Sequence, residues 1–146
     1  MRDMTGGCQC GRVRFTAQVE DGEAHLCHCR MCHRATGGVS AAFKNLPQAA
    51  VRWEVEPDFY RSSAIAQRPY CRECGTPLGF RYDTSDRIDL TIGSFDDPAF
   101  FFPTANFGIE SRLPAWENTS HLPGERAVEH ANTVARWREA GLEVPE

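Results

Sequence analysis

Three cysteines lie within six residues in the segment from His25 to His33, which reads HLCHCRMCH. Thiols at this density bind metal ions, form disulfides or act as redox groups. Cys27, Cys29 and Cys32 would give a zinc ion three ligands and leave a fourth position open, which is the arrangement of a catalytic site. Reactive free thiols, or a site that a histidine completes, are the alternatives for this triad.

The other four cysteines form two pairs, Cys8 with Cys10 and Cys71 with Cys74. In an extended chain, residues two apart point to the same face, so the first pair can reach one metal ion. The second pair reads CRECG, in which two thiolates on a tight turn converge and the glycine lets the chain turn closely behind them. The Gly-Thr-Pro that follows would break the helix that a thioredoxin-like redox motif opens. We therefore predict a closed four-thiolate structural zinc site, although spacing alone leaves other groupings of the seven cysteines open.

Histidines near the triad contribute less to this prediction. His28 lies between two proposed ligands, so in an extended chain its side chain would point away from their metal ion. His33 is adjacent to Cys32 and could be a fourth ligand or donate a hydrogen bond to a ligand. Residues 25–45 contain no acidic residue and carry three cations that could attract an anionic substrate, or form only a solvated surface: Arg30, Arg34 and Lys44.

Composition limits the class of protein. The chain of 146 residues fits one domain with a core of its own, and its formal net charge of −4 disfavours nucleic acid as a partner. The start has no apolar signal region and no stretch approaches 18 consecutive apolar residues, so we expect a cytoplasmic protein without a membrane partner. An odd number of cysteines, seven, cannot all pair as disulfides, and in a reducing compartment such clusters favour metal or redox chemistry.

The elements that must position these cysteines are mostly short strands. Alternating polar and apolar residues predict strands at 12–19, 51–55, 78–82 and 88–92, with weaker candidates at 39–43 and 105–109. Residues 83–87 have the composition of a hairpin loop between two of these strands. Towards the C-terminus, one apolar stripe predicts a helix over 126–140, with Gly141 at its end. We expect a zinc-binding body over 1–124 and a helical tail over 125–146.

The chain resembles the glutathione-dependent formaldehyde-activating enzyme family, which includes the centromere protein V type, in five segments that occur in this order: GGCQCGRVRF, CHCRMCHRATG, YCRECGTPLGFRY, DLTIGSFDDP and ESRLP. The resemblance runs from about Thr5 to Pro123. It implies a mainly β fold of several short coiled antiparallel sheets around zinc. It also assigns the pairs at Cys8 and Cys71 to a structural zinc and the triad to a catalytic zinc, which makes two zinc ions per chain, the second of them filled or partly filled.

The same resemblance implies a zinc-dependent carbon–sulfur lyase or synthase that joins or cleaves a glutathione-like thiol and a small aldehyde such as formaldehyde. Family members with the same cysteines need not share a substrate, because function resides in a site rather than in a fold. Two further hypotheses remain beside the enzyme. One is a non-catalytic zinc-binding interaction module, and the other is a redox or metal sensor based on the triad thiols.

Overall fold

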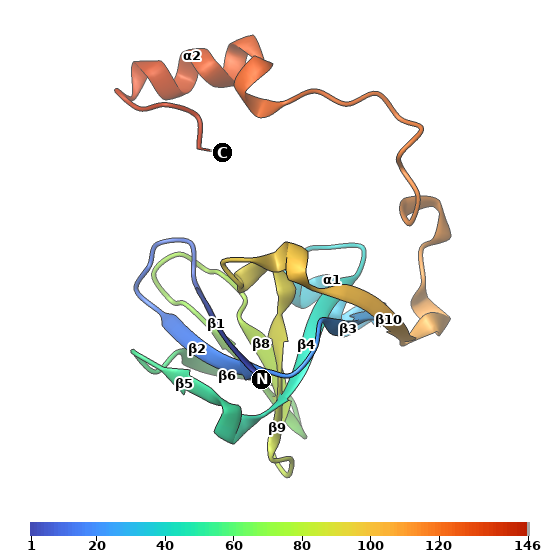
Figure 1. Ribbon diagram of the computed structural model, residues 1–146. Helices are drawn as coiled ribbons and strands as arrows, with labels where there is room; N and C mark the ends of the chain where they lie inside the picture. Colours follow the sequence, from blue (N-terminus) through green and yellow to red (C-terminus); the bar gives the residue numbers. More distant parts are fainter. Residues whose placement is uncertain (146) are drawn as a thin grey trace. The chain divides into compact units, whose positions relative to one another are not determined.

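The computed structural model describes residues 1–145 and divides the chain into two units, Met1–Leu113 and Pro114–Glu146. The first unit holds every cysteine and ten strands in two sheets (Figure 1). The prediction of a mainly β fold with a C-terminal helix is confirmed. The expected division into 1–124 and 125–146 stays a prediction, and we describe each unit by itself.

The smaller sheet has three strands in the order β1-β2-β5. Their bounds are Arg2–Gly7 for β1, Arg14–Val19 for β2 and Val51–Trp53 for β5. Both pairs of neighbours are antiparallel. Gly6 pairs with Phe95 in an isolated bridge, and a Cβ on Gly6 would meet the Phe15 ring, so this position requires glycine.

The larger sheet has seven strands in the order β10-β3-β4-β9-β8-β7-β6. In that order their bounds are Phe102–Phe107, Glu23–Cys27, Ala41–Pro47, Arg87–Thr91, Gly79–Tyr82, Ala66–Tyr70 and Asp58–Ser63. Short 3₁₀ turns lie at Gln48–Ala50, Ile92–Ser94, Pro98–Phe100, Ile109–Ser111, Pro114–Trp116 and Ala127–Glu129.

One pair of strands in the larger sheet departs from the antiparallel pattern, because β10 runs parallel to β3. A parallel neighbour needs a long crossover, and here most of the first unit lies between the two strands.

All six predicted strands are present, with ends that differ by a few residues. Four further strands and one short helix had not been predicted: β1, β3, β6, β7 and helix α1 (Arg30–Thr36). The predicted hairpin is also confirmed, because β8 and β9 pair antiparallel on either side of the predicted loop.

The main core lies between the two sheets. In β2 the alternating residues Phe15, Ala17 and Val19 are fully buried, as their spacing predicts. They pack with side chains from both sheets and the loop after β9: Met4, Leu46, Ile88, Leu90 and Phe95. Phe15 is the centre of this cluster, because its ring makes edge contacts with Trp53 at 5.4 Å and Phe95 at 5.2 Å between centroids.

The second unit contains helix α2, Ala131–Glu139, which begins five residues later than predicted. The chain first forms the 3₁₀ turn Ala127–Glu129, and the His130 side chain then caps the helix by accepting from the Thr133 backbone N–H. Gly141 has the predicted left-handed conformation, with φ of 74°. Within residues 1–145, no helix is both long enough and apolar enough to cross a membrane.

We predict that Phe15→Ala lowers the free energy of unfolding by about 3–5 kcal/mol, since it leaves a cavity in the main core. Phe102→Ala is the matched control, because Phe102 is 54% exposed, and its change should stay within about 0.5 kcal/mol. Urea unfolding of the metal-loaded proteins measures both. Equal effects of the two substitutions would contradict this description of the core.

Candidate metal centres

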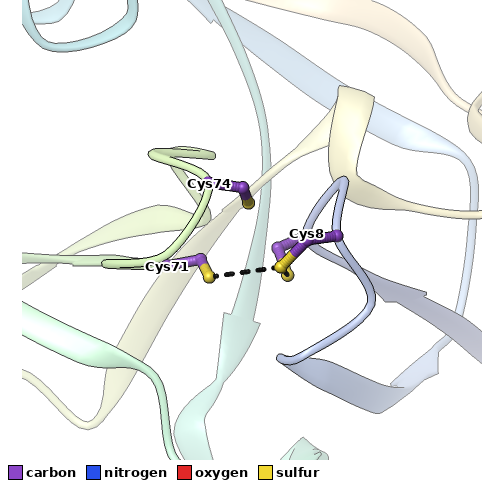
Figure 2. A group of neighbouring side chains, drawn as sticks. Cys8, Cys71 and Cys74 are labelled. Atoms are coloured by element: carbon purple, nitrogen blue, oxygen red, sulfur yellow. Dashed lines mark hydrogen bonds between the residues drawn. The ribbon is translucent and has the colours of Figure 1, made fainter. Parts of the chain in front are cut away.

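Four sulfur atoms from two distant parts of the chain converge in the first unit. They belong to Cys8, Cys10, Cys71 and Cys74, and all lie within 4.8 Å of one another. The Sγ–Sγ distance is 3.5 Å for Cys8 and Cys10 and 3.8 Å for Cys10 and Cys71. A tetrahedral zinc site with Zn–S bonds of about 2.3 Å places its sulfurs about 3.8 Å apart. These residues therefore fit a zinc ion, and Figure 2 shows Cys8, Cys71 and Cys74 with their sulfurs facing one another.

Local hydrogen bonds hold these sulfurs in place. The Val13 backbone N–H donates to Cys8 Sγ at 3.3 Å, which fixes the loop after β1. Gly75 has φ of 77° and its N–H donates to the Cys71 carbonyl at 2.7 Å, which closes the tight turn that the sequence predicts. The hydroxyl and then the backbone N–H of Thr76 lower the pKa of Cys74 to about 5, so this thiol ionises readily. Ionised sulfur is the form that binds metal.

The triad also comes together, within the same distance limit of 4.8 Å. Cys27 ends strand β3, Cys29 is the N-cap of α1, and Cys32 lies in the first turn of that helix. Cys27 and Cys29 sulfurs are 3.5 Å apart, and the Cys32 N–H donates to Cys29 Sγ at 3.4 Å. The end of β3, the N-cap of α1 and the first turn of α1 therefore place the three sulfurs close together.

Among residues 1–145, no histidine nitrogen or carboxylate oxygen joins the triad within 4.8 Å of all three sulfurs. His28 is buried and its Nε2 lies 2.8 Å from Asn106 Oδ1, so it holds β10 rather than a metal ion. His33 is buried, and neither of its ring nitrogens has a hydrogen-bond partner. Within residues 1–145 the triad therefore offers three ligands to a metal ion, and a fourth ligand would have to come from outside this part of the chain.

Strand β10 supports the triad from the edge of the sheet. The His28 backbone N–H donates to the Phe107 carbonyl at 2.8 Å, directly beside Cys27. The next residue, Gly108, has φ of 67°, and a Cβ there would lie 2.8 Å from the Cys29 backbone nitrogen. Both its conformation and the close approach of Cys29 require glycine at this position.

Arg68 is the functional residue that sequence reasoning missed. It lies on β7 with 4% of its surface exposed, and its Nη2 donates to Cys32 Sγ at 3.4 Å. Its guanidinium also lies over the Phe80 ring, 4.9 Å from the centroid. Three thiolates around a zinc ion would keep one excess negative charge, and this buried cation offsets it. No local signal could have indicated the contact, because 36 residues separate Arg68 from Cys32.

The charge distribution within the triad follows from these contacts. The hydrogen bond from Cys27 and then the Arg68 guanidinium lower the pKa of Cys32 to about 5. The same shared proton, together with burial, raises the pKa of Cys27. The Arg68 guanidinium therefore favours negative charge at Cys32 rather than at Cys27.

The three cations predicted to bind substrate lie in different environments. Arg30 and Arg34 are exposed on α1, and their role stays a prediction. Lys44 is buried, and its Nζ lies 2.6 Å from Asp21 Oδ1 and 2.8 Å from the Glu23 carbonyl oxygen. This ion pair engages the ammonium group, and the role of Lys44 in binding a substrate stays a prediction.

A pocket of about 230 Å³ opens beside the triad. Its walls are mostly apolar and aromatic, and they are formed by His25, Cys27, Cys29, Met31, Cys32, Phe43, Asn45, Arg68, Phe80, Tyr82, Asp89 and Phe107. On its polar side, the Asn45 amide donates to Asp89 Oδ1 at 2.9 Å. A small molecule in this pocket would lie against the three sulfurs.

Comparisons with known proteins agree with this arrangement. An uncharacterized lyase of Schizosaccharomyces pombe is 30% identical over 82 residues, which are 56% of this chain and 60% of that protein's length. The fold is similar to the crystal structure of a Rhodobacter sphaeroides protein with a TM-score of 0.54 and 21% identity, over 64% of this chain and 88% of that one. The family described as glutathione-dependent formaldehyde-activating enzyme matches residues 3–111, a range that contains both cysteine clusters. The chain therefore belongs to the glutathione-dependent formaldehyde-activating enzyme family.

We predict that Cys71→Ser destabilises the first unit and removes one zinc ion, because this fully buried sulfur joins the turn after β7 to the loop after β1. Closed zinc sites in small domains contribute about 10–16 kcal/mol in apparent binding free energy. Thermal melting and metal analysis measure the effect. A soluble variant with the parent melting temperature and full zinc would contradict the structural assignment.

We predict that Arg68→Met weakens zinc binding at the triad by about 10–100-fold, the usual loss when a group that contacts a metal ligand is removed. Competition with a chromophoric chelator measures it, and Arg68→Lys should give an intermediate value. Arg81→Met is the matched control, because Arg81 also lies over a ring, that of Phe59 at 4.1 Å, and donates to Gln48 rather than to a sulfur. Equal chelator curves for Arg68→Met and the parent would refute the electrostatic role.

Proposed function

We propose that this protein is a zinc-dependent carbon–sulfur lyase or synthase that joins or cleaves a thiol and a small aldehyde. The observation that carries the proposal is the triad, which offers three sulfur ligands without a fourth ligand from the described chain and faces a pocket. Three protein ligands with one open position are typical of catalytic zinc, whereas structural sites are closed. Family membership and the lyase name of a relative support the same class of reaction.

The two cysteine clusters would have different roles, one structural and one catalytic. Cys8, Cys10, Cys71 and Cys74 would hold a structural zinc ion, and Cys27, Cys29 and Cys32 a second one. A zinc ion at the triad would supply positive charge to a thiol in its open position and so lower the pKa of that thiol. Free thiols have a pKa of about 8.5, so only a few per cent is thiolate at neutral pH.

The chain's own residues would position the reactants. Arg68 would balance the charge of the thiolates while donating to Cys32, and the apolar walls would reduce the number of water molecules around the aldehyde. In the joining direction, a carbon–sulfur bond forms, the C=O π bond breaks, and the thiol proton ends on the aldehyde oxygen. Cleavage reverses these changes and releases the thiol and the aldehyde. Holding both partners in one pocket would give the reaction the advantage of proximity and orientation.

The test is exchange between formaldehyde, a thiol and their adduct at equilibrium, followed by NMR. Glutathione is the first thiol of the panel, because the family is named for it, and neutral thiols of several sizes complete it. The parent protein with its metal should accelerate exchange for at least one thiol. Absence of acceleration with every thiol would contradict the proposal, and reversible disulfide formation within the triad would indicate a redox sensor instead.

We predict that Cys29→Ser removes this activity, leaves the protein folded and lowers the metal content by about one ion per chain. Serine is a good N-cap, so helix α1 should begin at the same residue while the sulfur ligand is lost. Circular dichroism, metal analysis and the exchange assay measure the three effects. Exchange at the parent rate in this variant would exclude the triad as the catalytic centre.

A further inference from the structure

We propose that the pocket beside the triad selects a thiol whose substituent is neutral and apolar, preferably aromatic, rather than the anionic tripeptide glutathione. This inference rests on the proposed function and names the substrate class of the same site. It depends on two independent features of the pocket, its charges and its aromatic walls.

The charges of the pocket disfavour an anion. Asp89 lines it with a carboxylate, whereas the charges of the triad, a bound zinc ion and Arg68 would cancel. Among the described residues that line the pocket, Arg68 is the cation. Its Nη2 already donates to Cys32, and its Nε is enclosed by protein. Lys44 is engaged in its ion pair with Asp21. A glutathione carboxylate that entered this pocket would lose its hydration and meet no cation free to replace it.

The aromatic walls favour an apolar group. Phe43 forms a buried wall, and the Phe80 and Tyr82 rings meet edge to face at 86° with centroids 4.9 Å apart. At the rim, Phe107 is 61% exposed and Tyr82 is 45% exposed. A ligand that covers these rings gains about 25 cal/mol for each Å² of apolar surface removed from water. The exposed rim therefore provides binding free energy that a polar peptide would not use.

An arylmethyl thiol satisfies both features. Its sulfur would face the triad sulfurs while its ring covers Phe107 and Tyr82. With an aldehyde, its S–H adds across the C=O bond: the carbon–sulfur bond forms, the π bond breaks, and the proton ends on the former carbonyl oxygen. No oxidant or reductant is needed for this step.

The experiment compares three thiols with formaldehyde: benzyl mercaptan, 2-mercaptoethanol and glutathione. NMR exchange gives kcat/KM for each with the zinc-loaded parent protein. Saturation-transfer NMR with benzyl alcohol separately measures binding of the ring without any reaction. We expect kcat/KM for benzyl mercaptan to exceed that for glutathione by at least about tenfold, the ratio that about 1.4 kcal/mol of differential binding gives.

Variants locate the selectivity in the pocket. Phe107→Ala and Tyr82→Ala should each reduce the ratio of benzyl mercaptan to 2-mercaptoethanol by about threefold to tenfold, and weaken benzyl alcohol binding. Phe102→Ala is the matched control, because Phe102 lies exposed on the same strand β10 and outside the pocket lining. Asp89→Asn removes a negative charge and should raise kcat/KM for glutathione by several fold.

Each result supports or overturns the inference. Glutathione used as well as benzyl mercaptan, with no effect of Phe107→Ala on the ratio, would overturn it while leaving the proposed function in place. Benzyl alcohol binding that depends on Phe107, without exchange for any thiol, would support the ligand class and refute the proposed function. Absence of benzyl alcohol binding would overturn the inferred ligand class directly.

Discussion

A buried arginine beside a cysteine sulfur lies on the same strand that leads into the second cysteine cluster. Arg68 donates to Cys32 Sγ from the middle of β7, and three residues later Cys71 belongs to the four-sulfur cluster. A cation that is 4% exposed needs an anionic partner, and three clustered thiols need a cation, so each makes the burial of the other favourable. A shift of β7 by one residue would turn Arg68 to the other face of the sheet and move Cys71 out of its cluster.

The edge of the larger sheet gives the triad its open side. β3 ends at Cys27, α1 begins directly after Cys29, and β10 closes against both through Gly108. Because β10 is the last strand of the sheet, its exposed rim leaves room for a pocket next to the sulfurs. The four-sulfur cluster instead joins the turn after β7 to the loop after β1.

Sequence spacing identified the two pairs and the triad, because motifs such as CxC and CxxCG fix local geometry within a few residues. It left several groupings of these motifs open, and only the fold brings the two pairs together in one cluster. Alternation likewise predicted β2, whose Phe15, Ala17 and Val19 face the core. Strand β7 was not predicted. Pro69 disfavours a strand, and the polar Arg68 is buried, so the strand lacks the usual alternation of buried apolar and exposed polar residues. The pocket could not be predicted either, because Phe43, Tyr82 and Phe107 come from three strands that only the topology brings together. The sequence likewise indicated Lys44 as a cation free to bind a substrate. Its ion pair with Asp21 is a tertiary contact, which the sequence could not show.

In the proposed function, a metal ion at the triad is open to a thiol and the ion at the four-sulfur cluster is closed. Cobalt(II) in place of zinc makes this visible, because sulfur-to-metal charge-transfer and d–d bands report the ligands of each ion. Titration of the fully cobalt-loaded protein with a thiol should change the spectrum of one ion and leave that of the other unchanged. Cys29→Ser should remove the responsive spectrum. A spectrum that no thiol alters, with two ions bound, would show that both centres are closed and would contradict an open fourth position at the triad.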